Sequence, residues 1–296
     1  MKKIELIKIV KCQNLLGEGI QWNSQSQSFW WTDILSRQLY SYHLEDDLLK
    51  SWNLPERLGC FAFVENRSEL LCAFESGFAW YDPVTSHCEW IAKPESHWVG
   101  NRLNDGRCDR HGRFWSGSVT EEKNHPSQSA GLFCLDSQLK TSQHLSGLKI
   151  SNALCWSRDS SKMYHADSPT HSLRVYDFDV ETGRIGNSRV FAQTETSVDP
   201  DGACVDADDY IWNAQWGGSR VVRYAPDGAI DCVLSMPISQ ATCVAFGGRD
   251  FSILAVTSAR IGLSNEALIA QPEAGNLFFF KTEFKGLPES QFIFRG

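Results

Sequence analysis

The sequence predicts an all-β protein, a six-bladed β-propeller with four-stranded blades. Of the 296 residues 12% are aromatic and 22 are glycine, whereas only 3 are methionine. This composition favours strands and tight turns over helices. A pattern of about 17 residues also recurs six times along the chain, and such a repeat is a sign of a propeller.

Each repeat contains a short apolar strand, a polar turn and a second apolar strand that includes an aromatic residue or leucine. The six copies are GEGIQWNSQSQSFWWTD (17–33), LGCFAFVENRSELLCAF (58–74), LNDGRCDRHGRFWSGSV (103–119), SNALCWSRDSSKMYHAD (151–167), PDGACVDADDYIWNAQW (200–216) and ATCVAFGGRDFSILAVT (241–257). They begin roughly 41 to 50 residues apart, which is the spacing of four-stranded blades. We therefore expect one blade for each repeat.

Further strands complete the expected blades. Segments such as QLYSYHLED (38–46) and LRVYDFD (173–179) follow the repeats and end in acidic turns. KIELIKIV (3–10) and GNLFFFKTE (275–283) also have the pattern of strands, and pairing them in the last blade would close the ring and remove exposed sheet edges. Because no Pro-rich linker or low-complexity tract interrupts the chain, we expect a single domain over residues 1–296.

Charge and composition exclude several classes of protein. The net charge is −8 and the basic residues are scattered, so no basic stripe is offered to a nucleic acid. No apolar stretch approaches the roughly 18 residues of a membrane span, and Glu5 and Lys8 interrupt the N-terminal apolar run that a secretory signal needs. The 10 cysteines occur singly, mostly within apolar runs, which is typical of reduced, buried thiols. We expect a soluble cytoplasmic protein with no obligate protein partner.

The repeats share a register at the start of the first strand. Four places before a buried apolar anchor stand, in turn, Glu18, Gly59, Asn104, Asn152, Asp201 and Thr242. Equivalent positions in a ring of blades lie at one height and converge on one axis. Glu18, Asn152 and Asp201 should therefore meet at one spot, with Asn104 beside them.

This set of side chains predicts a metal site. Two carboxylates in a partly enclosed channel repel each other unless one is protonated or a cation lies between them. Oxygen ligands from Asp, Glu and Asn suit one hard divalent ion, Ca²⁺, Mg²⁺ or Mn²⁺, with Zn²⁺ also allowed. Taken singly, GEG, NDG and PDG are also common turn sequences, but their shared register favours a site.

The sequence contains no other catalytic or nucleotide-binding motif. There is no G-x-S-x-G elbow, P-loop or H-E-x-x-H sequence, and GEGIQW lacks the third glycine of a dinucleotide fingerprint. Asp33 and Asp167 end equivalent strands, WWTD and YHAD, and we interpret them as repeated strand-end residues rather than as catalytic groups.

Over nearly its whole length the chain resembles the gluconolactonase and regucalcin-like lactonases, the senescence-marker-protein family of six-bladed propellers. The matching stretches are LGEGIQW, NRLNDGRCDRHGRFWSGS, SNALCWSRDSSKMYHADS, DPDGACVDADDYIWNAQWGGSRVVRYAPDG and QPEAGNLF. Two residues depart from the family pattern. Ile20 stands where a proline is usual after GEG, and Ala153 stands where a glycine is usual after Asn152.

The resemblance implies roles for six residues. Glu18, Asn152 and Asp201 would hold the divalent ion, and Asp201 would also act as general base. Arg102 and Asn104 would contact substrate oxygens, and Glu121 would hydrogen-bond a sugar hydroxyl. Because a carboxylate on a cation is a weaker base than a free one, Asp105 and Glu121 remain second choices as proton acceptor.

Such a site suits the hydrolysis of a sugar lactone. A bound divalent ion polarises an ester carbonyl or lowers the pKa of a water molecule from 15.7 toward ~7 to 9. The resemblance implies a small-molecule sugar lactone as substrate, L-arabinono- or D-gluconolactone, in carbohydrate catabolism. Two alternatives stay open: hydrolysis of another ester or an organophosphate at the same site, and a calcium-binding regulatory or scaffold propeller without turnover.

Overall fold

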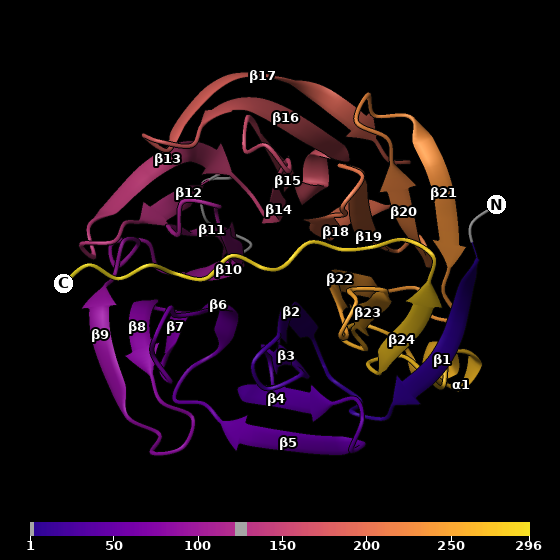
Figure 1. The fold of residues 1–296 in the computed structure, drawn as a ribbon. Coiled ribbons are helices and arrows are strands. Elements are labelled where there is room, and N and C mark those ends of the chain that lie inside the picture. The colour runs from indigo at the N-terminus through magenta and orange to yellow at the C-terminus, as the bar shows by residue number, and fades with distance from the viewer. Residues whose placement is uncertain (1–2, 122–128) are drawn as a thin grey trace.

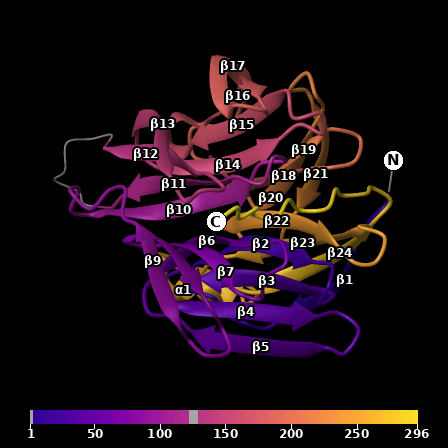
Figure 2. The ribbon, with the colours of Figure 1, turned by 60° about the vertical axis from the view of Figure 1, so that its left-hand side comes forward.

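The computed structural model describes residues 3–121 and 129–296. They form six four-stranded antiparallel sheets that are arranged around a central axis (Figure 1). The sequence-based prediction of a six-bladed β-propeller is therefore confirmed. Each sheet begins with an inner strand near the axis and ends with an outer strand at the rim, as Figure 2 shows for β2 to β5.

The first three blades follow one another along the chain. The first contains β2 (Gly17–Asn23), β3 (Ser28–Asp33), β4 (Gln38–His43) and β5 (Leu48–Asn53). The second contains β6 (Leu58–Phe63), β7 (Leu70–Phe74), β8 (Gly77–Tyr81) and β9 (Cys88–Ala92). The third contains β10 (Asn101–Cys108), β11 (Phe114–Thr120), β12 (Ala130–Leu135) and β13 (Thr141–Leu148).

The remaining blades include two short helices in their connections. The fourth contains β14 (Ser151–Trp156), β15 (Lys162–Asp167), β16 (Ser172–Asp179) and β17 (Arg184–Gln193), with the 3₁₀ turn η1 (Ser168–Thr170). The fifth contains β18 (Asp199–Val205), β19 (Ile211–Trp216), β20 (Arg220–Tyr224) and β21 (Ile230–Ser235). The sixth contains β22 (Ala241–Gly247), β23 (Ile253–Ser258) and β24 (Leu277–Thr282), with α1 (Asn265–Ala270) before β24.

The first strand of the chain closes the ring. β1 (Ile4–Val10) is the outer strand of the sixth blade and pairs antiparallel with β24, with Ile4 opposite Thr282 and Val10 opposite Leu277. The pairing of the two terminal segments, predicted from KIELIKIV and GNLFFFKTE, is confirmed. Among the described residues, no helix is long and apolar enough to cross a membrane.

The inner strands share an irregularity near the position that the repeat register selected. In β2 the pairing with β3 shifts between Glu18 and Gln21, and in β14 the pairing with β15 shifts between Asn152 and Cys155. In β18 the shift lies between Pro200 and Ala203. A bulge of this kind bends a strand and redirects its side chains, so the start of each inner strand can face the axis.

Apolar side chains fill the space between blades. Trp31, Trp115 and Trp212 come from equivalent second strands and are fully buried. All 10 cysteines are free, and 7 of them are buried. The expectation of reduced thiols packed in apolar surroundings agrees with this arrangement.

After β24 the chain crosses one face of the propeller (Figure 1). The backbone of this C-terminal segment (283–296) hydrogen-bonds to the turns that follow the inner strands, at Glu65, Gly112, Ala207 and Phe251. These turns belong to the second, third, fifth and sixth blades. The segment therefore lies against the end of the channel at which the inner strands finish.

Candidate functional site

A cavity of about 380 Å³ lies where the inner strands begin. Its polar lining includes all six residues that the sequence analysis selected: Glu18, Arg102, Asn104, Glu121, Asn152 and Asp201. They come from the inner strands β2, β10, β14 and β18 and from the residue after β11. Residues up to 183 positions apart, from Glu18 to Asp201, thus share one cavity because the ring brings equivalent strand positions together.

A chain of hydrogen bonds fixes the two amides at the floor of the cavity. Arg102 Nη1 donates to Asn104 Oδ1 at 2.7 Å, and Asn104 Nδ2 donates to Asn152 Oδ1 at 3.1 Å. Asn152 Nδ2 in turn donates to Ser168 Oγ at 2.9 Å, and Ser168 Oγ donates to the Pro200 carbonyl at 2.8 Å. With both Nδ2 groups engaged, the Asn152 oxygen keeps a lone pair for a further partner.

Two carboxylates of the cavity, Glu18 and Asp201, are destabilised as anions. Burial, followed by the negative charge of Asp105, raises the pKa of Glu18 to about 8. Burial also raises the pKa of Asp201 well above its ordinary value, and the charges of Glu18 and Asp105 act in the same direction. Oδ1 of Asp201 is buried and receives no hydrogen bond from any described residue. An unpaired buried carboxylate oxygen needs a proton or a cation.

These donors fit a hard divalent cation. Two carboxylates that repel each other and an amide oxygen with a free lone pair offer oxygen ligands only, which Ca²⁺, Mg²⁺ and Mn²⁺ accept. Within residues 3–121 and 129–296, no group of three His, Cys, Asp or Glu side chains is placed to bind a metal. A cation in this cavity would therefore rely on the amide oxygen beside the two carboxylates.

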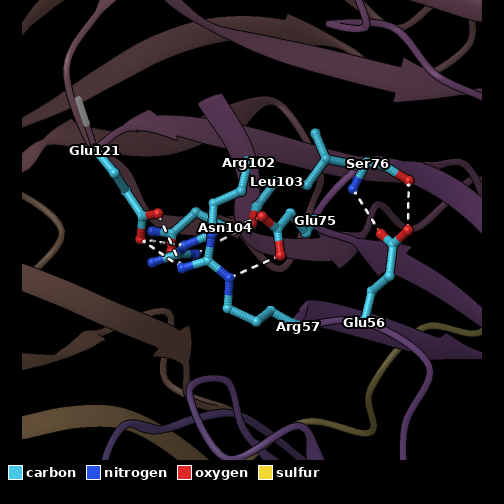
Figure 3. A network of polar contacts seen from close by, with 8 residues as sticks. All are labelled: Glu56, Arg57, Glu75, Ser76, Arg102, Leu103, Asn104 and Glu121. Atoms are coloured by element: carbon cyan, nitrogen blue, oxygen red, sulfur yellow. Dashed lines mark hydrogen bonds and ion pairs between the residues drawn. The ribbon is translucent and has the colours of Figure 1, made fainter. Parts of the chain in front are cut away.

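Arg102 is held from the side by an ion-pair network (Figure 3). Its Nε lies 2.8 Å from Oε1 of Glu121, and Nη1 of Arg57 lies 2.9 Å from Oε2 of the same carboxylate. Arg57 also makes a bidentate pair with Glu75, at 2.8 and 2.7 Å. Burial opposes ionisation of Glu121, but the charges and hydrogen bonds of Arg102 and Arg57 bring its pKa below the ordinary value.

Asp105 lies outside the lining of the cavity. It is buried, and its Oδ2 accepts a hydrogen bond from the backbone N–H of Leu154 at 3.1 Å. Burial raises its pKa, while Arg107 lowers it. Its contribution to the site is therefore a negative charge near Glu18 and Asp201 rather than a contact with the cavity.

The cavity also has an apolar rim. Six side chains from five blades form it: Leu16, Leu35, Val119, Ile150, Trp216 and Ile261. Most of them keep part of their surface exposed, and Ile261 is 39% exposed. The site therefore combines a polar floor with a hydrocarbon rim, an arrangement that is common in small-molecule sites.

Comparisons with known proteins agree with this architecture. Residues 16–260 match the SMP-30/gluconolactonase/LRE-like region. The chain belongs to this family. Within the SMP-30/gluconolactonase/LRE-like family it is 38% identical to L-arabinolactonase of Azospirillum brasilense over 282 residues, which cover 95% of this chain and 93% of the relative. It is 32% identical to 6-deoxy-6-sulfogluconolactonase of Pseudomonas putida, over 96% of this chain and 97% of the relative.

A solved structure of the SMP-30/gluconolactonase/LRE-like family has the same fold. The calcium-binding protein regucalcin from Agrobacterium tumefaciens superposes with a TM-score of 0.91 at 32% identity, and the match covers 98% of both chains. The resemblance noted in the sequence is thereby confirmed at the level of the family.

Two strand-end carboxylates that lie outside the cavity lining were assigned no role in the site from the sequence. Asp33 accepts hydrogen bonds from the backbone of Leu15 and Leu16, just before Glu18, and Asp167 accepts equivalent bonds from Ile150, just before Asn152. These two strand-end carboxylates therefore hold the segments that lead into the site, and their repetition in WWTD and YHAD was the available signal.

Asp199 and Ser168 also line the cavity. Asp199 lies two residues before Asp201 on β18, and its Oδ1 is 3.1 Å from Nδ1 of His171. Neither was distinguishable from an ordinary turn residue before the fold was known, because their position depends on the η1 turn and the neighbouring blade.

Proposed function

We propose that this protein hydrolyses a sugar lactone, an intramolecular ester of an aldonic acid, with the help of one divalent metal ion. L-Arabinono- and D-gluconolactone are the proposed substrates, and the identity to L-arabinolactonase over 95% of the chain favours the first. The observation that carries the proposal is the convergence of Glu18, Asn152 and Asp201 with Arg102 in one cavity, where a buried Asp201 oxygen has no partner among the described residues.

Glu18, Asn152 and Asp201 would hold the ion. Two observations support this assignment. The two carboxylates repel each other, and a cation between them would relieve the repulsion. The Asn152 amide is held in a fixed orientation by its hydrogen bonds. When bound, a divalent ion supplies a positive charge that stabilises developing negative charge on the lactone carbonyl and acidifies water.

Arg102 and Asn104 would orient the lactone. Arg102 is 6% exposed and lines the cavity, so hydrogen bonds from its guanidinium to substrate oxygens form away from bulk water and are strong. Glu121 lines the cavity next to Arg102 and can accept a hydrogen bond from a sugar hydroxyl.

Asp201 is the proposed proton acceptor for the attacking water. Glu121 is a weaker base than an ordinary carboxylate because Arg102 and Arg57 lower its pKa. Asp105 does not line the cavity, and one of its oxygens is engaged by Leu154. Asp201 lines the cavity, and one of its carboxylate oxygens accepts no hydrogen bond from residues 3–121 or 129–296, which favours it over both second choices.

A second candidate function is calcium binding without turnover. The observation that favours it is the similarity to regucalcin, whose solved structure is described as that of a calcium-binding protein. Such a protein would use Glu18, Asn152 and Asp201 in the same way but would not need Arg102 to contact a substrate.

The deciding experiment measures acid release by pH-stat from L-arabinono-1,4-lactone and D-glucono-1,5-lactone. Chelator-stripped protein is assayed alone and with Ca²⁺, Mg²⁺, Mn²⁺ or Zn²⁺, and phenyl acetate and paraoxon serve as non-sugar esters. We expect lactone hydrolysis that an added ion restores and that disappears in Glu18→Gln and Asp201→Ala. Glu89→Gln, on the outer strand β9, is the matched control and should retain full activity.

The outcomes separate the candidates. Ion-restored turnover of a sugar lactone that outpaces the non-sugar esters supports the proposal and ranks substrates and ions. Tight ion binding without turnover of any lactone or ester would favour the calcium-binding candidate. Turnover that is unchanged in the chelator-stripped protein and in Glu18→Gln would contradict the metal-dependent mechanism.

A further inference from the structure

Arg107 occupies the interior of the channel below the cavity and does not line it. It lies on β10 and is 5% exposed. Its side chain reaches across the channel, where Nε donates to the Ala203 carbonyl at 3.1 Å and Nη2 donates to the Val244 carbonyl at 2.9 Å. Nη2 also lies 3.5 Å from the Ile20 carbonyl. One guanidinium thus connects four inner strands.

The carbonyls that Arg107 contacts lie directly behind the site. Ile20 is two residues after Glu18, and Ala203 is two residues after Asp201. Both belong to the stretches in which the strand register shifts. An inner strand has no neighbouring strand on its channel side, so carbonyls that face the channel need a donor from elsewhere. Arg107 supplies these donors next to two of the proposed ligands.

Glu289 holds the remaining end of the guanidinium. Nη1 of Arg107 lies 2.6 Å from Oε1 of Glu289, which belongs to the C-terminal segment and has a side chain that is 18% exposed. The pair is neutral overall, so the channel holds no uncompensated positive charge from Arg107. Removing one partner of a buried pair leaves the other charge unpaired, which is strongly unfavourable.

We propose that Arg107, held by Glu289 of the C-terminal segment, is a positioning residue for the ion site. It fixes the backbone of the strands that carry Glu18 and Asp201 without touching the ion or the lactone. This inference rests on the proposed function, because it concerns the same ligands. Through Glu289, the C-terminal segment thereby helps to stabilise a site at the opposite end of the channel.

Arginine suits this role better than lysine. A planar guanidinium presents five N–H groups in fixed directions, and here they are directed at two carbonyls and a carboxylate in different directions. A lysine ammonium would keep the charge but could not hold three strands and Glu289 in the same rigid geometry. We therefore expect Arg107→Lys to bind Ca²⁺ more tightly than Arg107→Met but more weakly than the wild type.

The test measures Ca²⁺ affinity by isothermal titration calorimetry on chelator-stripped protein, with thermal melting as a separate readout of the fold. Terbium luminescence provides a second measure of affinity, since Trp216 lines the same cavity and can sensitise a bound Tb³⁺. The central variant is the double substitution Arg107→Met/Glu289→Gln, which keeps the channel electrically neutral. Arg113→Met/Asp109→Asn removes another buried ion pair, of 2.6 Å, outside the channel and serves as the matched control.

If Arg107 positions the ligands, the neutral double variant should bind Ca²⁺ roughly 10- to 100-fold more weakly, as is usual when a second layer around a metal site is removed. The control pair should lower the melting temperature and leave Ca²⁺ affinity unchanged. Glu289→Gln alone keeps an oxygen at Arg107 and should give a smaller loss. If the variants that carry Arg107→Met do not fold, the Ca²⁺ affinity of Glu289→Gln tests the inference instead.

Two results would overturn the inference. Wild-type Ca²⁺ affinity in the folded double variant would mean that Arg107 has no positioning role, and an equal loss in the control pair would mean that the effect is one of general stability. Glu18→Gln in the same titration separates this inference from the proposed function. If Glu18→Gln leaves Ca²⁺ affinity unchanged, the proposed ion site itself fails.

Discussion

Arg57 and Glu121 link the second and third blades beside the cavity, with Nη1 of Arg57 2.9 Å from Oε2 of Glu121. The other oxygen of Glu121 accepts from Nε of Arg102 at 2.8 Å. Glu121 is therefore clamped between two guanidinium groups, which lower its pKa. This arrangement suits a carboxylate that orients Arg102 and accepts a hydroxyl hydrogen bond, and it does not suit a general base.

The first prediction concerns the Arg57 end of this clamp. Arg57→Met should raise KM for the lactone roughly two- to fivefold, because a partly exposed ion pair of this kind contributes up to about 1 kcal/mol. Ion affinity should not change, since Arg57 contacts Glu121 and Glu75 but none of the proposed ligands. Steady-state kinetics together with Ca²⁺ titration check both statements. Arg67→Met, another arginine of the second blade, is the control, and a loss of ion affinity in Arg57→Met would refute the prediction.

The second prediction concerns Gly19, which has a φ of 60° next to Glu18. Gly19→Ala should destabilise the protein by about 1 kcal/mol, because a side chain in this region is strained. The added Cβ would also lie 3.3 Å from the Gly59 carbonyl, which should displace Glu18 and weaken ion binding. Gly147→Ala, at φ 73° with no atom within 4 Å, is the control for strain alone. Equal ion affinity in Gly19→Ala and Gly147→Ala would contradict the prediction that the added Cβ weakens ion binding at Glu18.

The residues of the site floor were predictable because each belongs to a local motif that repeats. Glu18, Asn104, Asn152 and Asp201 follow from one register, and the ring then fixes their convergence. Ala153, where the family pattern has glycine, takes a φ of 58°. The backbone therefore keeps the left-handed conformation with a methyl group in place, and the departure seen in the sequence leaves the turn intact.

The supporting contacts could not be predicted in the same way. Arg107 and Glu289 are separated by 182 residues, and Arg57 and Glu121 by 64. Neither pair forms a motif, because each contact depends on how far a long side chain reaches across a channel or between blades. The path of the C-terminal segment is likewise set by backbone hydrogen bonds to turns in four blades, which leave no pattern in its sequence.

The third prediction is an acid lability that originates at His165. Its Nε2 lies 2.8 Å from Ser151 Oγ, and burial lowers its pKa to about 4. In the unfolded chain His165 takes up a proton below pH ~6.5, whereas in the folded protein it stays neutral until about pH 4. The folded state is therefore not penalised above pH ~6.5, and its free energy of unfolding decreases as the pH falls toward 4. The loss should amount to about 3 kcal/mol.

Denaturant unfolding of wild type and His165→Gln between pH 7 and 4 measures this effect. Glutamine can keep a hydrogen bond to Ser151 without binding a proton, so the variant should lose less stability across the interval. His87→Gln removes an exposed histidine and should follow the wild-type curve. Parallel curves for His165→Gln and wild type would assign the acid lability to other groups.

The fourth prediction concerns the apolar rim, which should discriminate between lactones by the group on C4. L-Arabinono-, D-fucono- and D-galactono-1,4-lactone share a ring configuration and carry CH₂OH, CH(OH)CH₃ and CH(OH)CH₂OH there. Leu35 and Ile150 offer hydrocarbon to this group and no hydrogen-bond partner. Burying the additional hydroxyl of the galactono compound without a partner costs about 1 to 3 kcal/mol, so its kcat/KM should fall roughly tenfold below that of the fucono compound.

The variant Leu35→Ser tests whether the rim causes this preference. A serine hydroxyl at that position offers the galactono side chain a partner, so the ratio of the two kcat/KM values should move toward one while the arabinono value changes little. Leu49→Ser, on the outer strand β5 and 38% exposed in the wild type, is the control and should preserve the ratio. Equal kcat/KM values for the fucono and galactono lactones in the wild type would mean that the C4 substituents extend past the apolar rim into water. The apolar rim would then have no part in specificity.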